Sequence, residues 1–483
     1  MTNYVPSLYI NISGAIGTLT NAGQLSELRI QQRLGLPALC EIVFSSQFEL
    51  IEKIVIGQSL EVAIQDADEI LFKGDITAVE YVYPSATAPT LRVRGYDCLH
   101  RLRKRQHVRA YVNCGLSGLL HELAEGEAEV VRAGPVWPLL IQHQQNDLEF
   151  LTEQAALIGC YPLARGDRIY FIPLSGLPDQ DDISLKYGHN LYEARIEANV
   201  DDNCTAVSVI GWDTSRSGAP HGQAKTDRTD GQSGVRVNVR DVGGMPERAL
   251  INQGLGDEEH ALALARAELE RRQAGDVVLW GRAQGNHALQ PGVPVVVGHV
   301  APAAAGRYIL TAVTHTFDFT SGYTVEFSSE PPPVPLRSRC DVATLGIVAD
   351  VRDPENMGRI RARLSGYDDV ETGWMPVVCP GAGKGKGLLT LPDPGDRVLV
   401  LLAREDPARG IVLGGLYAPE EAPDDCTASR HADRYTWMTR DGQRISLDQS
   451  KNMVLIENGA GAEIEMKGNE IIFKAGRIDF RRS

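Results

Sequence analysis

The chain has 483 residues, 43% of them apolar and 23% charged, which is typical of globular proteins and excludes general disorder. Its 48 basic and 63 acidic residues give a formal net charge of −15. That sign disfavours nucleic acid or an anionic membrane as the main partner, because both attract basic surfaces. The length predicts about three domains at roughly 100–200 residues each.

Targeting and redox signals point to an intracellular origin. Residues 1–6 lack the basic end and apolar core of a signal peptide, and apolar runs such as Val293–Val297 are too short to span a bilayer. The eight cysteines include no CxxC pair, which indicates isolated thiols in a reducing compartment. We therefore expect synthesis in the cytoplasm without a signal peptide, and no stable membrane insertion.

The first 100 residues alternate apolar and polar side chains in short runs, which predicts strands at Leu60–Ile64, Ile76–Val82 and Leu91–Arg94. Helical spacing follows at Leu116–Glu125 and Asn146–Ile158. A β-pair is then expected at residues 161–163 and 168–172, turning at Gly166 and Asp167.

The polar stretch Thr214–Gly234 predicts a mobile loop. Asp257–Gln273 has acidic residues in its first turn and arginines near its end, so it is the clearest predicted helix. Strands are expected to resume at Val277–Trp280, Val293–Val297, Ile309–Val313 and Tyr323–Phe327.

Proline-rich residues 331–335 form a stiff linker and the best domain boundary. Beyond it, Ala343–Tyr417 has the strand and glycine-turn pattern of a small barrel, followed by a second linker at Ala418–Asp425. We expect an N-terminal domain at 1–335, a barrel at 340–418, a linker at 419–435 and a last domain at 436–483.

The last domain repeats pairs of apolar residues that flank one residue, with Gly or Asn between the pairs. This rhythm is typical of a β-solenoid. Full burial of ten such side chains would contribute roughly 15–30 kcal/mol at most, but a single thin ribbon leaves both faces in water. Three copies around one axis would bury them, so the block predicts a homotrimer. The predicted trimer core is Ile445, Leu447, Val454, Ile456, Ile464, Met466, Ile471, Phe473, Ile478 and Phe480.

Enzyme-like motifs each lack a residue that their mechanism requires. His121–Glu125 begins like a zinc-protease helix, but Glu125 stands where the second histidine is needed. Gly381–Gly387 resembles a phosphate-binding loop, but no Ser or Thr follows its lysine. The basic run Arg101–Arg105 carries no interleaved aromatic side chains, so it is expected to be a solvated face or a contact to an acidic neighbour. We predict no catalytic, cofactor-binding or metal site.

Several motifs, taken in order, resemble one family. Asn146–Leu151 resembles its D-L-x-F-L helix, Gly285–Gly292 its G-N-x-x-L-x-P-G turn, and Gly306–His315 its G-x-Y-x-V-x-x-V-x-H strand. Pro392–Val400 and Ile411–Tyr417 resemble strands of its small barrel. The chain thus resembles the VgrG-like spike of contractile injection systems, which is similar to the fused baseplate hub and central spike of contractile phage tails.

The resemblance implies a mainly β fold with two hub β-barrels carrying inserted helices, an OB-fold barrel as a collar, and a C-terminal trimeric β-helix needle. It implies a structural homotrimer that adapts a hexameric inner tube to a three-fold needle piercing a target envelope. Baseplate proteins around the hub, a PAAR-like tip protein and effector cargo are the implied partners.

Only about 18 residues separate Tyr417 from Thr436, which leaves no room for a lysozyme domain between barrel and needle. The expected tip, Arg481, Arg482 and Ser483, has no histidine for a tip metal and carries no fused effector. Phage tail, type VI secretion and extracellular phage-tail-like particle stay open, with the short C-terminus favouring the last. A tail-associated peptidoglycan-degrading enzyme and a glycan-binding host-recognition spike are the alternative functions.

Overall fold

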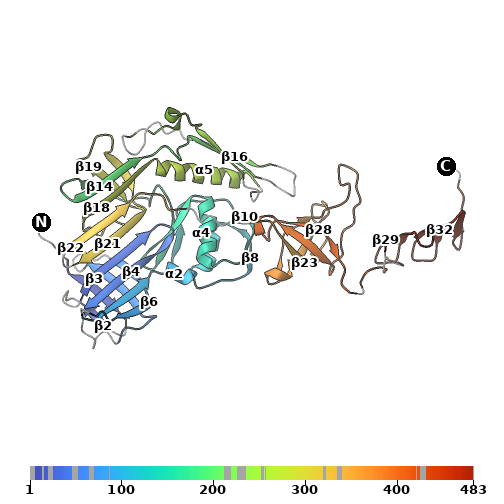
Figure 1. Ribbon diagram of the computed structural model, residues 1–483, viewed down its shortest axis with the longest axis horizontal. Helices are drawn as coiled ribbons and strands as arrows, with labels where there is room; N and C mark the ends of the chain where they lie inside the picture. Colours follow the sequence, from blue (N-terminus) through green and yellow to red (C-terminus); the bar gives the residue numbers. More distant parts are fainter. Residues whose placement is uncertain are drawn as a thin grey trace.

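The structure is a computed structural model that describes residues 6–13, 16–19, 25–45, 53–64, 70–85, 88–211, 219–225, 235, 237–251, 255, 257–318, 322–333, 340–419, 421–424 and 431–481. It is mainly β and elongated, with three parts in succession along its long axis (Figure 1). We call them the hub (6–333), the collar (340–419) and the shaft (431–481). In the part of the chain that is described, no helix is long and apolar enough to cross a membrane.

The hub is built on one eleven-stranded sheet. Its strands alternate buried and exposed residues, as in β3, where Leu28 and Ile30 are fully buried. In order across the sheet, the strands are β14 (Leu191–Ala198), β18 (Val277–Gln284), β22 (Gly322–Ser328), β21 (Ala312–Asp318), β3 (Leu25–Arg33), β4 (Leu36–Ser45), β7 (Thr90–Tyr96), β6 (Ile70–Val82), β5 (Ser59–Ile64), β1 (Leu8–Ile12) and β2 (Ile16–Leu19).

Four smaller sheets complete the hub. They are β8 (Arg109–Cys114) with β10 (Trp137–Gln142), β9 (Ala128–Val130) with β12 (Arg168–Pro173) and β11 (Cys160–Arg165), β13 (Ile183–Lys186) with β19 (Pro294–Gly298) and β20 (Gly306–Ile309), and β15 (Ala206–Ile210) with β16 (His221–Lys225) and β17 (Glu247–Ile251).

This topology differs from the two hub barrels that we expected. Eleven of the described hub strands join in one continuous path because β21, late in the hub, pairs antiparallel with β3 near its start. The single strand expected at Ile309–Val313 is divided between β20 and β21, which belong to different sheets. The chain changes sheet at Leu310 and Thr311.

The predicted hub helices are confirmed as α3 (Leu116–Leu123), α4 (Asp147–Leu157) and α5 (Glu258–Gly275), and a short α2 spans Leu99–Leu102. Asn146 caps α4 by accepting a hydrogen bond from the Glu149 backbone N–H, and the Glu149 carboxylate accepts one from the Asn146 backbone N–H. Gly159 follows the helix with φ +70°, a conformation that favours glycine.

The loop expected at Thr214–Gly234 is wrong in part, because His221–Lys225 forms β16. A Cβ on Gly222 of this strand would lie 2.2 Å from backbone atoms of Ala261 and Leu262 in α5. Glycine thus allows the strand to pack directly on the helix. Residues 212–218 and 226–234 lie outside the described residues, and a 3-10 helix, η2 (Val239–Val242), precedes β17.

The collar is a six-stranded sheet with its own buried core, including Val348, Ile360, Val398 and Val412. Its strands are β23 (Val342–Asp350), β24 (Arg359–Leu364), β25 (Val370–Glu371), β26 (Met375–Pro376), β27 (Arg397–Leu402) and β28 (Gly410–Leu416), with 3-10 helices η3 (Ser365–Tyr367) and η4 (Ala403–Glu405).

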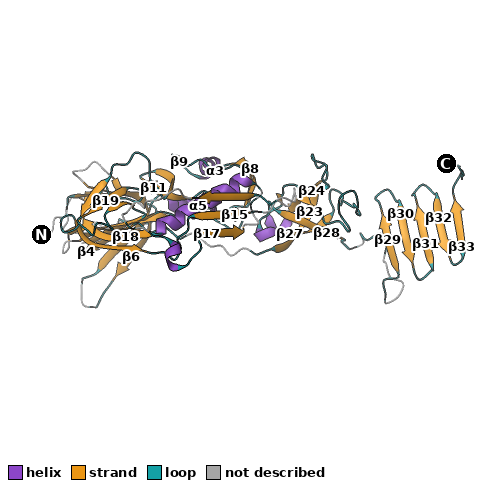
Figure 2. Cartoon of the chain, turned by 90° about the horizontal axis from the view of Figure 1, so that it is seen from above, coloured by secondary structure: helices purple, strands orange, loops and turns teal. Residues whose placement is uncertain are grey.

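The shaft is a five-stranded antiparallel sheet in which each strand pairs with the next along the chain. Figure 2 shows the strands lying across the long axis, so their backbone hydrogen bonds run along it. Within one chain these hairpins form no solenoid coils, contrary to the expected rhythm, because each short turn reverses the strand. The strands are β29 (Arg434–Met438), β30 (Arg444–Asp448), β31 (Met453–Glu457), β32 (Glu463–Lys467) and β33 (Glu470–Lys474).

Candidate functional site: an unpartnered apolar face on the shaft

Strand register places the apolar pairs of the shaft on one face of its sheet. Directly opposed residues of antiparallel strands point to the same face. Ile445 opposes Ile456, and Ile456 opposes Ile464, so the same side chains continue from strand to strand. Two rows result: Trp437, Ile445, Ile456, Ile464 and Phe473, and Tyr435, Leu447, Val454, Met466 and Ile471.

We call these ten residues the apolar shaft face. Eight of them are 39–66% exposed in the single chain, and Val454 and Ile464 are half-buried. Scattered exposed apolar side chains are ordinary on protein surfaces, but a contiguous face marks an interaction site. The shaft face is contiguous across all five strands.

The opposite face of the shaft is largely polar and is partly covered by the preceding segment. Asp424 accepts a hydrogen bond from the Thr436 hydroxyl and forms an ion pair with Arg434 at 3.6 Å. Ser446 and Asp448 of the same face are buried, and the Arg434 guanidinium also binds the Asp448 carboxylate at 3.2 Å. The two faces therefore differ in chemistry and in what covers them.

Eight of the ten predicted trimer-core residues lie on the apolar shaft face. The other two, Ile478 and Phe480, follow β33 outside any strand, and Phe480 is 96% exposed. Arg481 of the predicted tip is exposed, and Arg482 and Ser483 lie outside the described residues.

Sequence reasoning missed Tyr435 and Trp437. Both lie on β29 and extend the two rows by one strand. The signal was present, because the two aromatics flank one residue just as the later pairs do. They stand before the glycine-spaced pairs that began the predicted repeat.

The collar has a second apolar outer face. Leu345 on β23 opposes Leu399 on β27, and both point away from the core formed by Val398 and Val400. Leu345 and Leu413 are exposed, whereas the outer residues of a strand on a solvated barrel are normally polar. Further outer apolar residues are Ala343, Leu401 and Ile411.

The hub and the collar touch through one joint. The His143 ring, which follows β10, meets the edge of the Tyr367 ring of the collar at a centroid distance of 5.4 Å. Leu139 of β10 lies beside Gly373, and β25 contacts β8. His143 and Thr372 are buried at this joint, so the collar packs on the hub as well as being linked to it.

The glycines of the hub turn at 285–292 explain its motif. A Cβ on Gly285 would lie 2.0 Å from the Tyr323 ring, and Gly292 adopts φ +84°. The Asn286 side chain accepts a hydrogen bond from the Ala288 N–H, and Leu289 is fully buried. This turn connects the eleven-stranded sheet to the sheet of β19.

The enzyme-like motifs have structural contacts. Glu122 of α3 pairs with Arg109, and Glu125, which follows the helix, pairs with Arg105 at 3.1 Å. The loop at 381–387 closes on itself through paired backbone hydrogen bonds between Gly383 and Lys386, and a strand-like segment rather than a helix follows. Among the described residues, no group of three or more potential ligands could hold a metal ion.

Two of the four basic residues in the run 101–105 form ion pairs within the chain. Arg101 binds the Asp75 carboxylate with two hydrogen bonds of 2.8 and 3.0 Å. Arg105 pairs with the buried Asp147 at 3.1 Å. Arg101 and Arg105 therefore belong to a charge network within the hub, whereas Arg103 and Lys104 are exposed.

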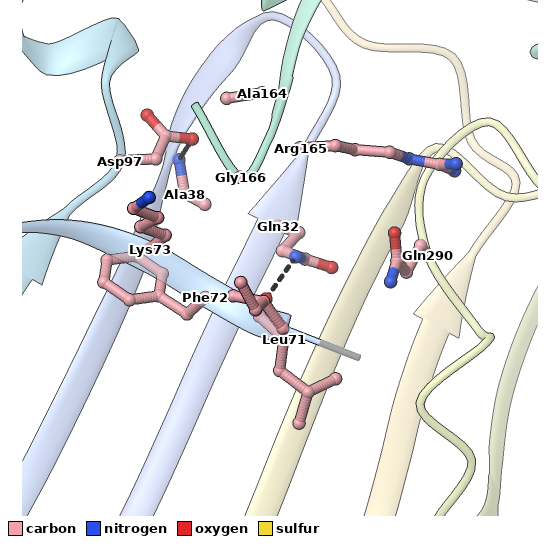
Figure 3. Close-up of a pocket in the computed structure, with 11 residues that line it drawn as sticks. Gln32, Ala38, Leu71, Phe72, Lys73, Asp97, Ala164, Arg165, Gly166 and Gln290 are labelled. Carbon is pink, nitrogen blue, oxygen red and sulfur yellow. Dashed lines mark hydrogen bonds between the residues drawn. The ribbon is translucent and has the colours of Figure 1, made fainter. Parts of the chain in front are cut away.

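A small polar cavity lies between the main sheet and the β11–β12 hairpin (Figure 3). Gln32 donates a hydrogen bond to the Leu71 carbonyl at its edge. Asp97 accepts bonds from the N–H groups of Ala38 and Leu99, while burial raises its pKa to about 7. The cavity volume of about 30 Å³ suits one or two waters, whereas substrate pockets measure roughly 300–1,000 Å³.

Comparisons with known proteins agree with this architecture. Residues 344–417, the collar, match the family model of the type VI secretion system and phage-baseplate injector OB domain. No curated protein matches the sequence significantly.

Solved structures share the fold. A chain of the lidded Francisella PdpA–VgrG complex aligns with a TM-score of 0.58 and 8% identity, over 97% of this chain and 80% of that one. The E. coli c3393 protein, a component of the type VI secretion system with structural similarity to T4 tail proteins gp27 and gp5, aligns with a TM-score of 0.56 and 15% identity, over 84% and 99%. The 43 kDa tail protein of Shewanella oneidensis prophage MuSo2 aligns with a TM-score of 0.50 and 13% identity, over 68% and 99%.

The collar is accordingly an OB domain of the type VI secretion and phage-baseplate injector kind, and the chain shares the fold of VgrG and phage-tail proteins, as its motifs predicted. The family model described as the Alg8 N-terminal domain matches residues 45–318, more than half of the 483 residues. The chain belongs to that family.

Proposed function

We propose that the protein is the homotrimeric hub and spike at the tip of a contractile injection particle. In this proposal the domains are those expected from the sequence: a hub at 1–335, an OB-fold collar at 340–418, a linker at 419–435 and a trimeric β-helix shaft at 436–483. Three shaft sheets surround one axis with their apolar faces inward. The observation that carries the proposal is the apolar shaft face, which one chain leaves exposed.

The collar supports the same assembly independently. Its outer apolar residues, including Leu345 and Leu413, are exposed on a different part of the same elongated molecule. Two separate apolar faces in succession along one long axis favour copies aligned in parallel along that axis (Figure 1). Burial of both faces in one assembly also removes the aggregation hazard that such surfaces create.

The work of the shaft is mechanical. Its hydrogen bonds run along the long axis, so a force along that axis loads the ladder of five strands. The hub–collar joint at His143 and Tyr367 transmits the same force between the two larger parts. The protein adapts a hexameric inner tube above the hub to the three-fold shaft, and the shaft pierces the target envelope when the particle contracts.

We assign the proposed partners to the two ends of the molecule, the hub and the free end of the shaft. The inner tube and baseplate proteins surround the hub, and a PAAR-like protein covers the free end of the shaft, where Ile478 and Phe480 are exposed. Effector cargo is a further passenger of such a particle.

Glycan binding by the collar receives little support from two of its three aromatic residues, Trp374 and Tyr367, whereas the third, Tyr417, is exposed. Arg361 covers the Trp374 ring at 5.7 Å from its centroid, and Tyr367 is engaged by His143. These two engaged rings offer little surface to a sugar.

Adjacent isoleucines on β33 test the proposal. Ile471 lies on the apolar shaft face and Ile472 on the other face, and both are exposed in the single chain, at 62% and 45%. Ile471→Asp should weaken or abolish the trimer, because three carboxylates would meet in a dry core. Ile472→Asp introduces the same charge one residue away and should leave the trimer intact.

Sedimentation velocity of the purified full-length variants measures the outcome. Dissociation of Ile471→Asp alone supports the proposed face. Equal behaviour of the two variants, or dissociation of Ile472→Asp alone, would contradict it.

A further inference from the structure

Two exposed histidines from distant parts of the hub lie side by side. His189 stands in the turn between β13 and β14, and His299 follows β19. Their ring centroids are 5.2 Å apart and the rings are inclined at 72°. Neither imidazole hydrogen-bonds to another side chain in the described part of the chain, and both residues are exposed.

Backbone contacts fix both residues in place. The parallel pair of β13 and β19 sets Lys186 opposite Gly298, and the Tyr187 N–H donates to the Gly298 carbonyl at 3.1 Å. The Asn190 side chain accepts a bond from the Lys186 N–H and donates to the Ser184 carbonyl, at 2.7 and 2.9 Å. The turn that carries His189 is therefore tied to the strand that presents His299.

His299 also has an unusual backbone. Its φ of +61° lies in the left-handed region, which side chains other than glycine rarely adopt. Such conformations are retained where the surrounding structure holds them, and they concentrate at binding sites. Here the conformation presents the His299 ring beside that of His189.

We propose that His189 and His299 form a binding site for a divalent transition-metal ion of the imidazole-preferring class, Zn²⁺, Ni²⁺ or Cu²⁺. At metal–nitrogen distances of about 2.0–2.1 Å, two imidazoles on one tetrahedral ion have centroids roughly 5 Å apart. The observed centroid distance of 5.2 Å agrees with this value. Two histidines supply half of a tetrahedral ligand set, which leaves two positions to water or to a ligand from a neighbouring protein.

The place of the two histidines in the fold determines what the two open coordination positions face. β19 lies at the end of the hub remote from the shaft in both views (Figures 1 and 2). A metal held there faces whatever adjoins that end. Spacing within the sequence gave no sign of the site, because only the pairing of β13 with β19 brings the two residues together.

Titration of the full-length protein with NiCl₂ tests the site. The background is Cys340→Ser, since the exposed Cys340 thiol is a competing ligand. We expect one Ni²⁺ per chain, with affinity reduced at least about tenfold by either His189→Gln or His299→Asn. Asparagine at 299 tolerates the left-handed backbone, so that variant should fold. The matched control is His121→Gln, an exposed histidine on α3.

Electron paramagnetic resonance with Cu²⁺ provides a second readout. Two-nitrogen superhyperfine splitting in the parent, reduced in each single variant but not in His121→Gln, supports the site. Stoichiometry and spectra unchanged by His189→Gln and His299→Asn would overturn it and leave the two rings as an aromatic contact only.

Discussion

Single buried polar groups decide the stability of the hub core. His315 on β21 is completely buried, and its Nδ1 lies 3.0 Å from the Tyr323 hydroxyl, whose ring stacks on Phe317. Burial lowers the pKa of His315 to about 4, because the charged imidazolium loses its hydration. The group is thus neutral in the folded hub at neutral pH.

His315 should make the hub sensitive to acid. Its pKa in the unfolded chain is about 6.5, so the folded state binds fewer protons between pH 6.5 and 4. Its contribution to stability is complete above pH 6.5 and is lost as the pH falls toward 4, by about 3 kcal/mol at most. His315→Gln should flatten this slope in urea unfolding measured at pH 4.5, 5.5 and 7. An identical slope in the variant would show that His315 does not cause it.

A buried ion pair holds the β23–β24 hairpin of the collar. The Arg359 guanidinium donates two hydrogen bonds, of 2.7 and 3.0 Å, to the Asp353 carboxylate, and both side chains are more than nine-tenths buried. Asp353 also accepts bonds from the N–H groups of Glu355 and Met357. These donors hold the pKa of Asp353 far below its usual range.

Asp353→Ala should destabilise the collar by about 3–5 kcal/mol, because it leaves the Arg359 charge buried without a partner. Asp350→Ala is the matched control, since it removes an exposed pairing with Arg352 in the same hairpin. Urea unfolding followed by tryptophan fluorescence compares the two. Equal shifts of the midpoint would contradict a special role for the buried pair.

At the scale of elements, local sequence signals predicted the helices, which are stabilised by interactions between residues close together in the chain. The sequence contains the capping pair Asn146 and Glu149 of α4 and the acidic first turn of α5. Both signals predicted helices, and both helices form where expected. The pairing of strands could not be predicted from the sequence, because no short-range pattern specifies that β3 pairs with β21 or that β13 runs parallel to β19. The expectation of two hub barrels was wrong for that reason.

For the candidate site too, the sequence predicted one part and the structure was needed for the other. Alternation predicted the apolar pairs of the shaft, while the register that aligns them on one face, and adds Tyr435 and Trp437, needed the structure. The spacing of residues in the sequence did not predict the proposed metal site at His189 and His299, because the two residues come close together only through the pairing of strands.

Packing of α5 on β16 depends on Gly222. A Cβ there would overlap the α5 backbone, which can yield only by moving the whole helix. Gly222→Ala should therefore lower stability by about 1–3 kcal/mol or more. Gly298→Ala in β19, with open space around its Cβ, is the control, and hydrogen exchange of α5 amides is the measurement. Unchanged protection of α5 in Gly222→Ala would refute the close contact.

At the scale of the whole molecule, the described part of a single chain leaves two apolar faces exposed. Apolar faces on the collar and the shaft follow one another along the long axis, and the collar packs on the hub at His143 and Tyr367 (Figure 1). The net charge of −15 favours solubility before assembly and disfavours attachment to nucleic acid. The proposed parallel trimer would bury both apolar faces at once.

The most direct test is the mass of the full-length protein in solution by multi-angle light scattering. Three chains of 52.6 kDa give 3 × 52.6, about 158 kDa, and this is the predicted mass. A monomer of 52.6 kDa, or a dimer of 2 × 52.6, about 105 kDa, over the micromolar concentration range would contradict the trimeric spike.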